Sequence, residues 1–252
     1  MSDRTIWYFV KFFAKESHAD QFIKGGLYLN RLSYFKKIET DDEDGRPDTH
    51  EAIAMWWQPD DLIIKFKAPG LEEIEITKTD LAGPVSMSFE YHDHVHIFCL
   101  YAMHTVSLEC MDKEADLAEN EAEFRRQLRV DERCIKFGPF AVVIRAVPFL
   151  AQLKGALLRE KKAARGELVQ YYDEETYHGE IDPKDIPFRK QKRFCYQQEF
   201  RICVQTNTKG DDPITIDIGD ISHICAKLDS SRLNGEFKVQ LSLAPPPDVP
   251  AK

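Results

Sequence analysis

The stretch Phe188-Arg-Lys-Gln-Lys-Arg-Phe-Cys-Tyr-Gln-Gln-Glu-Phe-Arg-Ile-Cys-Val204 runs from a basic cluster through aromatic residues and a glutamine pair into an alternating apolar segment. The bulky and β-branched side chains from Phe200 to Val204 are typical of a β-strand, which places Glu199 at the mouth of that strand. A carboxylate there, two residues after Gln197, can hold a sugar hydroxyl while the nearby cations bind a phosphate. The alternative is that Glu199 and Arg201 form a surface salt bridge on an edge strand, an arrangement that is common and weak.

Short apolar runs separated by turn residues continue on both sides of this stretch. Strands are predicted at 6–13, 27–35, 62–67, 74–77, 85–89, 92–101, 140–147, 168–172, 214–218, 221–226 and 237–243, and helices at 17–24, 112–128 and from 149 to 165. The first helix has Ser17 as its expected N-cap, with Asp20 three residues later, and Gly25-Gly26 as its stop. Because the short spacings favour hairpins over parallel crossovers, the predicted fold class is α+β, with a mixed, largely antiparallel sheet and inserted helices.

Length and composition set limits on the class of protein. A chain of 252 residues, 43% of them hydrophobic, can bury a large core in a single domain over 1–244, followed by a proline-rich tail, 245–252, that is predicted not to fold. The balance of 34 Lys and Arg against 43 Asp and Glu gives a net charge of −9, which argues against a protein that coats nucleic acid through bulk charge. Six cysteines without a C-x-x-C pair, and the lack of a signal peptide or long apolar run, indicate a reduced, cytoplasmic protein that does not enter a membrane.

Three histidines precede the apolar segment that ends at Tyr101. His92, His94 and His96 are spaced i, i+2, i+4, so in a strand all three point to one face, as ligands of zinc or another transition metal do. This spacing supports a metal-dependent hydrolase as a further alternative. The other interpretation is three ordinary hydrogen-bonded histidines at the edge of a strand.

A second group of functional side chains, Arg46-Pro-Asp-Thr-His-Glu51, follows the acidic segment 39–44. Arg46 can clamp a phosphate with two hydrogen bonds, or it can neutralise its own acidic loop. No Walker loop, G-x-G-x-x-G, G-x-S-x-G or H-E-x-x-H motif occurs, so the chemistry is expected to come from dispersed residues. The basic and aromatic run 188–196 can also hold a single nucleotide strand, but the net negative charge favours a small nucleotide instead.

Several motifs together resemble an uncharacterised bacterial and phage family that is catalogued as a domain of unknown function. The resemblance spans roughly residues 6 to 204, and its strongest part is Phe188-x-Lys190 followed by Tyr196-Gln-Gln-Glu-Phe-Arg201. The other motifs that carry it are Tyr8-Phe-Val, Gly26-Leu-Tyr-Leu, Ser33-Tyr-Phe-Lys36, Arg46-x-Asp48-x-x-Glu51, Val95-His-Ile-Phe-Cys-Leu and Val169-Gln-Tyr-Tyr.

The order of a strand, a helix, Gly-Leu, a second strand and a late glutamate preceded by Gln-x is also similar to the layout of ADP-ribosyltransferases. In that family an early Arg or His, a Ser/Thr or Tyr on a middle strand, and the late Glu hold NAD. The resemblance implies that Glu199 and Gln197 are the catalytic residues. Tyr8 or Lys11 stands at the early position, and Ser33-Tyr34 stands near the place of the family's Ser-Thr-Ser, which this sequence lacks.

The resemblance therefore implies an ADP-ribosyltransferase-like enzyme that binds NAD or a related nucleotide, with Glu199 stabilising an oxocarbenium-like ribose. Arg46 and the 189–193 cluster are expected to bind the pyrophosphate, and Tyr34 or Phe35 to stack on a ring. The full set of expected nucleotide-binding residues is Tyr8, Tyr34, Phe35, Arg46, Lys190, Arg193 and Arg201. The competing expectation is a non-catalytic protein of phage defence or anti-defence, which uses the same cleft or the acidic 39–44 loop to bind a partner protein or a nucleotide signal.

Overall fold

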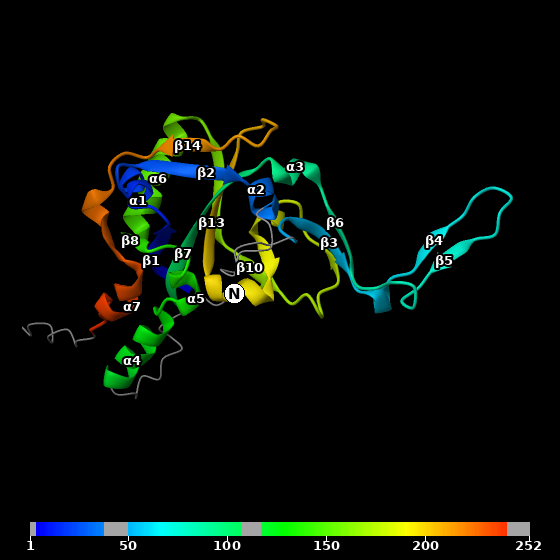
Figure 1. Ribbon diagram of the computed structural model, residues 1–252, viewed down its shortest axis with the longest axis horizontal. Coiled ribbons are helices and arrows are strands. Elements are labelled where there is room, and N and C mark those ends of the chain that lie inside the picture. The colour runs from blue at the N-terminus through cyan, green and yellow to red at the C-terminus, as the bar shows by residue number, and fades with distance from the viewer. Residues whose placement is uncertain (1–3, 38–49, 107–116, 241–252) are drawn as a thin grey trace, which may run out of the picture.

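The computed structural model describes residues 4–37, 50–106 and 117–240, and its centre is an eight-stranded sheet (Figure 1). Six strands follow one another in the order β14-β2-β7-β1-β8-β15, and β13 joins β7 to β9 beside this path. All strand pairs in this sheet are antiparallel. The strands are β1 (Arg4–Phe13), β2 (Gly26–Arg31), β7 (His96–Val106), β8 (Phe140–Arg145), β9 (Ala163–Leu168), β13 (Glu199–Gln205), β14 (Ile214–Asp217) and β15 (Cys225–Asp229).

The strand β7 has different neighbours along its length. One of its edges pairs with β13 from His96 to Tyr101. The other edge pairs with β1 from Tyr101 onward, but with β2 only at His96 and Ile97. Residues 98–100 therefore have no paired strand on that edge within the described chain, because β1 and β2 diverge there. This opening in the sheet positions the candidate site.

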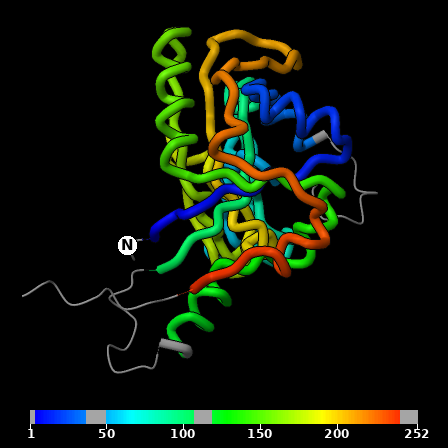
Figure 2. The backbone as a smooth tube through the Cα atoms, turned by 90° about the vertical axis from the view of Figure 1, so that its left-hand side faces the viewer, coloured from blue at the N-terminus to red at the C-terminus, as the bar shows by residue number. Residues whose placement is uncertain are grey.

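Both faces of the sheet are covered. Successive residues of β1, Phe9 and Val10, enter two different cores because side chains alternate between the faces of a strand. The larger core lies under α1 (Glu16–Ile23) and α6 (Ala146–Arg159), where the Phe9 ring contacts those of Phe149 and Phe200. Figure 2 shows α6 running along the sheet. The smaller core lies against α4 (Leu117–Gln127), α5 (Glu132–Ile135) and α7 (Leu233–Glu236).

A third core forms beside the main sheet, around α2 (Leu32–Lys37), α3 (Glu90–Asp93) and β3 (Ile53–Trp57). The strand β3 pairs with β6 (Val85–Ser88) and β11 (Gly179–Glu180), and β10 (Gln170–Tyr172) pairs in parallel with β12 (Arg189–Gln191). Short 3₁₀ helices connect several of these strands: η1 (Pro59–Asp61), η3 (Ile186–Phe188), η4 (Lys192–Gln197), η5 (Ser222–Ile224) and η6 (Ser230–Arg232).

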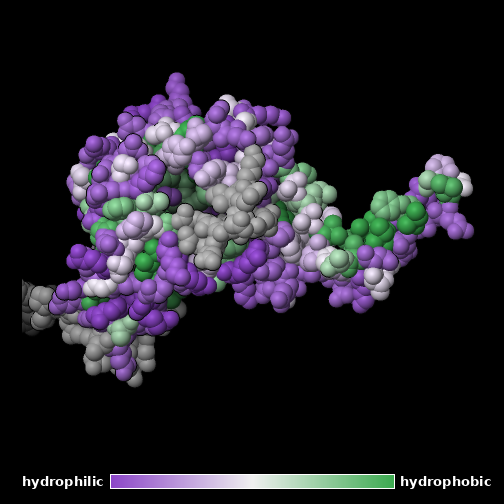
Figure 3. All heavy atoms as spheres, viewed as in Figure 1, coloured by the Kyte–Doolittle hydropathy of each residue, from purple (hydrophilic) through white to green (hydrophobic). Residues whose placement is uncertain are grey.

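A hairpin arm extends from the ends of β3 and β6. Its strands, β4 (Ile64–Phe66) and β5 (Ile74–Ile76), pair with each other and project from the body (Figure 1). Phe66 and Ile74 are directly opposite in this pairing and are more than half exposed. Figure 3 shows the apolar side chains gathered on the arm.

The predicted fold class is confirmed as α+β, with mostly antiparallel sheets. The stop of the first helix is also confirmed, since Lys24 is its C-cap and Gly25 has φ 103°. The predicted N-cap is wrong, because Ser17 lies inside α1 and Lys15 is the N-cap without a side-chain hydrogen bond. Burial of Ala19 and Phe22, rather than a capping box, holds this helix.

Several predicted strands are also wrong at one end, such as the one expected over 221–226, which is a 3₁₀ helix until strand β15 begins at Cys225. The strand expected over 27–35 ends at Arg31, and Leu32 begins a helix instead. Leu32 and Ser33 are both buried, which the alternation of a half-exposed strand does not allow. Residues 237–240 are not a strand. The Phe237 ring instead packs against the Tyr8 ring, with the ring centres 5.5 Å apart. The tail 245–252 and the helix start at 112–116 lie outside the described residues.

In the parts of the chain that the structure describes, no helix combines the length and the apolar composition needed to cross a membrane.

Candidate functional site

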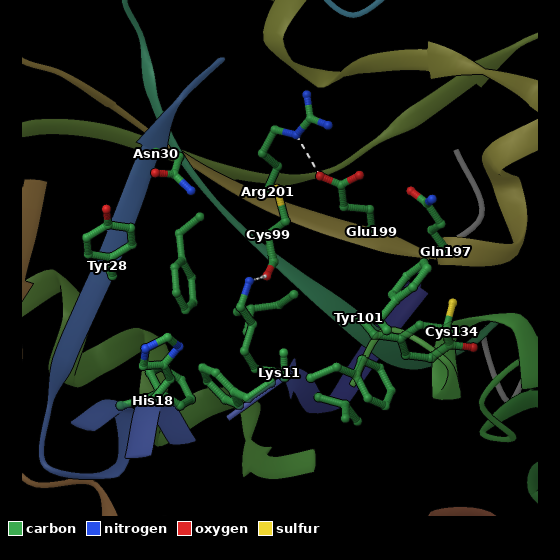
Figure 4. A pocket seen from close by; sticks show the side chains of 18 of the residues that line it. Lys11, His18, Tyr28, Asn30, Cys99, Tyr101, Cys134, Gln197, Glu199 and Arg201 are labelled. Carbon is green, nitrogen blue, oxygen red and sulfur yellow. Dashed lines mark hydrogen bonds and ion pairs between the residues drawn. The ribbon is translucent and has the colours of Figure 1, made fainter. Parts of the chain in front are cut away.

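A pocket of about 590 Å³ opens where β1 and β2 diverge, and we call it the cleft pocket. Figure 4 shows that its walls come from β1, β2, β7 and β13. Its aromatic lining residues are Phe12, Phe13, Phe22, Tyr28, Tyr34, Phe35, Phe98, Tyr101 and Phe137, and its charged or amide-bearing ones include Lys11, Asn30, Lys190, Gln197, Glu199 and Arg201. The pocket therefore combines flat apolar walls with a small set of polar groups, as small-molecule sites do.

Four charged side chains form a buried group beside this pocket, which we call the charge cluster: Glu51, Lys190, Glu199 and Arg201. Arg201 Nε donates to Glu199 Oε1 at 2.7 Å, and Arg201 Nη1 donates to Glu51 Oε1 at 2.7 Å. Lys190 Nζ lies 3.4 Å from Glu199 Oε2. Two carboxylates thus balance two cations, which is what allows charges to be buried.

Neighbouring polar groups complete the hydrogen bonds of the charge cluster. Lys190 Nζ donates to Gln197 Oε1 at 2.9 Å, and Arg201 Nη1 donates to the Pro187 carbonyl at 2.6 Å. The Tyr171 hydroxyl accepts from the Glu199 backbone N–H at 3.0 Å. These hydrogen bonds hold the side chains of the charge cluster in fixed positions, as a preorganised site requires.

The surface interpretation of Glu199 and Arg201 is wrong. Arg201 is 1% exposed and Glu199 is 6% exposed, and β13 is an internal strand with β7 on one side and β9 on the other. The position of Glu199 at the start of a strand is confirmed.

The electrostatics keep Glu199 ionised. Burial alone would raise the pKa of Glu199, but Arg201 and then Lys190 outweigh burial and hold that pKa well below its ordinary value. In the same way, Glu199 and Glu51 raise the pKa of Arg201 despite its burial. The nearby Cys99 thiol has its pKa raised to about 12 by burial and by Glu199, so it is not a thiolate nucleophile at neutral pH.

The backbone is unusual next to both carboxylates. Gln198, which precedes Glu199, has φ 38° and ψ 47°, and Ala52, which follows Glu51, has φ 57°. Left-handed conformations cost free energy in non-glycine residues and gather at functional sites, where the surrounding structure enforces them. Here Gln198 turns the chain from the 3₁₀ helix 192–197 into β13 and so aims Glu199 at the pocket.

Lys11 occupies the opening between β1 and β2. Its Nζ donates to the Cys99 carbonyl at 2.8 Å and lies 4.6 Å from the centre of the Phe98 ring (Figure 4). It thereby satisfies a carbonyl of β7 that the diverging strands leave without a ladder bond. Its positive charge stands on the pocket wall, where an anionic group of a ligand would meet it.

The structure brings together most, but not all, of the site residues expected from the sequence. Glu199, Gln197, Lys190, Arg201, Tyr34 and Phe35 line the cleft pocket. Tyr8 lies outside it, in the smaller core. Arg193 is exposed, with its guanidinium 4.8 Å from the centre of the Phe194 ring, and it does not line the pocket. Arg46 and the acidic segment 39–44 lie outside the described residues.

The three histidines do not share one face of a strand. His92 lies in the short helix α3, His94 is the C-cap of that helix, and only His96 belongs to β7. His92 Nε2 is 3.1 Å from the Pro183 carbonyl, whereas His96 Nε2 is 3.0 Å from the Asp212 carbonyl. No group of three or more His, Cys, Asp and Glu suited to a metal ion occurs among the described residues. The geometric premise of the metal site, a continuous strand from His92, is therefore wrong.

The sequence alone does not identify Glu51 as a partner of Arg201. The pair Glu51 and Arg201 is separated by 150 positions, so no local pattern joins them. Lys11 did carry a signal, since it is the single charged residue in the aromatic run Ile6–Phe13. A lone lysine among apolar residues is expected to contact a specific polar or charged group.

The chain matches no family model, no curated protein and no solved structure.

Proposed function

We propose that the cleft pocket binds NAD or a related nucleotide and that the protein is an ADP-ribosyltransferase-like enzyme, with a fold of that type. The observation that carries the proposal is an ionised glutamate, Glu199, at the first position of a strand and on the wall of an aromatic-lined pocket. Gln197 lines the same pocket two residues earlier. The volume of about 590 Å³ lies within the range of small-molecule and cofactor pockets.

The pocket offers a partner for each part of a nucleotide. Tyr28 and Tyr34 present half-exposed aromatic rings on which a base or a nicotinamide can stack. Lys11 provides a cation for a phosphate group, beside Lys190 of the 189–193 cluster that the sequence predicts for this role together with Arg46. Glu199 provides acceptors for ribose hydroxyls.

Glu199 would act by electrostatic stabilisation. When the bond between nicotinamide and ribose breaks, its electron pair leaves with nicotinamide, and positive charge develops on the ribose. An ionised carboxylate has about four acceptor positions. Arg201 takes one on Oε1, Lys190 lies within reach of Oε2, and the Cys99 thiol is a further side-chain hydrogen-bond partner. The position that remains can accept a ribose hydroxyl, and the fixed negative charge favours the cationic transition state.

A non-catalytic protein that binds a nucleotide signal or a partner protein in phage defence is the second candidate. Two observations favour it, and the first is that the Glu199 charge is already balanced by Arg201 and Lys190 inside the protein. A balanced charge stabilises a developing cation less than a free one does. The absence of a Ser-Thr-Ser near Ser33 points the same way.

Calorimetric titration of NAD and ADP-ribose into the protein tests the binding proposal. Tyr34→Ala should weaken NAD binding about tenfold, since stacking on an aromatic side chain contributes roughly 1–3 kcal/mol per base. Phe66→Ala, which removes an exposed ring from the arm, is the matched control and should leave the affinity unchanged. If neither ligand binds the wild-type protein, the proposal is wrong.

A further inference from the structure

A second pocket, of about 630 Å³, lies at the opposite end of β13 from Glu199, and we call it the loop pocket. It is bounded by residues 91–95, the start of β9, the segment 183–188 and the loop 205–209. None of the described residues that line it is Asp or Glu, although the chain as a whole has a net charge of −9. Its charged lining residues are Arg165, Lys184 and Lys209.

These three cations are not equally available to a ligand. Arg165 is held by Glu167 and Asp185, with contacts of 2.5 Å and 2.9 Å. Lys184 Nζ lies 3.0 Å from Asp182 Oδ2 in an exposed pair, which water screens. Lys209 has no ion pair within the described residues. Lys184 and Lys209 therefore remain as the cations that an anion can engage.

A buried arginine adds positive charge behind the wall of the loop pocket. Arg31 is 3% exposed and donates to the carbonyl oxygens of His94, Thr208 and Asp212, and to Thr208 Oγ1. These acceptors are neutral, and no carboxylate of the described chain forms an ion pair with Arg31. A buried charge without a counterion exerts its field over several ångströms, because the surroundings screen it weakly. His94 and Thr208 themselves line the pocket.

Residues that line the loop pocket also carry buried polar atoms for which the described residues offer no hydrogen bond. His92 is 3% exposed, and its Nδ1 is buried and has no partner. Both ring nitrogens of His94 are buried without a hydrogen bond, and its Nε2 lies 3.6 Å from Glu90 Oε1. Buried polar groups are almost always satisfied in folded proteins, so unmet groups in a pocket point to a ligand or ordered water.

A flat apolar group is present beside these polar atoms. The Tyr91 ring is 56% exposed and lines the pocket. It stacks on the Phe89 ring, with centres 5.6 Å apart and an angle of 19°, and its centre is 4.0 Å from that of His92. A ring supported from behind in this way is a platform on which a planar group can stack.

We propose that the loop pocket is a second ligand site, for a small molecule that carries a phosphate and a flat ring, such as a mononucleotide. The phosphate would lie towards Lys184 and Lys209, within the field of Arg31, and the ring would lie on Tyr91. This inference goes beyond the proposed function of the cleft pocket and does not depend on it.

Titration calorimetry with AMP, adenosine and inorganic phosphate tests the site in the full-length protein. AMP should bind the wild type at least tenfold more tightly than adenosine or inorganic phosphate does, because only AMP carries both groups. The double variant Lys184→Gln/Lys209→Gln should weaken AMP binding at least tenfold. The matched control Lys24→Gln/Lys154→Gln removes the same charge from exposed positions outside both pockets, and should change the AMP affinity less than twofold.

Hydrogen exchange with AMP present then locates the site. Protection is expected in peptides that cover 91–95, 163–165, 183–188 and 205–209. Protection confined to 10–14, 26–35 and 98–101 would place AMP in the cleft pocket alone and overturn the inference. Failure of AMP to bind the wild type, or equal affinities in the two double variants, would also overturn it. Failure of NAD to bind, by contrast, bears only on the cleft pocket.

Discussion

Each member of the charge cluster is buried because the others are present. Arg201 contacts two carboxylates, Glu51 and Glu199, and removing the guanidinium would leave two buried acids with only Lys190 as a counterion. Breaking a buried ion pair by removing one partner costs far more than the pair contributes when intact, because the remaining charge stays desolvated. Replacing one member of the charge cluster should therefore measurably lower the free energy of unfolding.

Arg201→Met should lower the free energy of unfolding by about 3–5 kcal/mol, the cost of an uncompensated buried charge. Arg193→Met is the matched control, since Arg193 is exposed and lies outside the cluster, and it should change that free energy by no more than about 0.5 kcal/mol. Urea unfolding of both variants measures the difference. If both variants lose the same small amount of unfolding free energy, the charge cluster does not stabilise the fold.

The lowered pKa of Glu199 predicts a dependence of stability on pH. The folded pKa lies below the unfolded value of about 4.3, so the unfolded state binds more protons in this range and stability rises with pH. The contribution of Glu199 is complete above that unfolded value and is lost as the pH falls towards the folded pKa. Urea unfolding of the wild type and Glu199→Gln between about pH 3 and pH 6 should therefore give a difference that shrinks with acidity. A difference that does not vary with pH would contradict the assigned shift.

The sequence could predict Glu199 at the mouth of a strand, because alternation from Phe200 onward is a local signal. It could not predict burial, because that depends on β7 and β9, which cover β13 on both sides, and on Glu51, 150 positions from Arg201. A surface salt bridge between Glu199 and Arg201 is therefore an open alternative on sequence grounds, because most charged side chains lie at the surface.

At the scale of elements, the turn before β13 has a strained backbone conformation. Gln198 has a left-handed backbone, and its N–H and carbonyl are both bonded, to the Cys195 carbonyl and the Ala102 N–H. Its side-chain Oε1 is buried and has no hydrogen-bond partner in the part of the chain that the structure describes. The side chain therefore contributes little that would offset the conformational cost.

Gln198→Gly should raise the free energy of unfolding by up to about 1 kcal/mol, because glycine adopts positive φ without the steric penalty. Both backbone hydrogen bonds remain available to glycine. Urea unfolding measures the change, with the slope of the transition as a check that the unfolded state is unaltered. A loss of stability instead would mean that the Gln198 side chain is needed for packing.

Element boundaries were less predictable than the elements themselves. Apolar runs at 27–35 and 92–101 both indicated strands, yet the first ends in helix α2 and the second begins in helix α3. Periodicity over so few residues does not separate a buried helical turn from a strand, and tertiary contacts decide. The divergence of β1 and β2, which creates the cleft pocket, has no signal in either strand's own sequence beyond the lone Lys11.

At the scale of the whole molecule, the arm stands apart from the body. Among the described strands, β4 and β5 pair with each other and with no other strand, and their opposed residues Lys65 and Glu75 form an exposed ion pair at 3.1 Å. Apolar side chains on the other side of this hairpin, such as Phe66 and Ile74, stay exposed. None of the described residues of the arm lines the cleft pocket.

Replacing residues 60–82 with a short glycine-containing turn should therefore change the melting temperature by no more than a few degrees, since little buried apolar surface is lost. Nucleotide affinity of the cleft pocket should be unchanged. Calorimetric melting and NAD titration of the shortened protein check both expectations. A large drop in melting temperature would show that the arm supports the body through β3 and β6.

The most direct test of the proposed function is nicotinamide release from NAD by the wild type, Glu199→Gln and Glu51→Gln. Both variants remove one carboxylate of the charge cluster, so both lower stability, but only Glu199 lines the cleft pocket. Assayed at a temperature where all three are folded, the wild type should release nicotinamide, and Glu199→Gln should lose on the order of a hundredfold or more of this rate. Glu51→Gln should lose less than about tenfold. If the wild type binds NAD but releases no nicotinamide, or if the two variants lose activity equally, the catalytic role of Glu199 is contradicted.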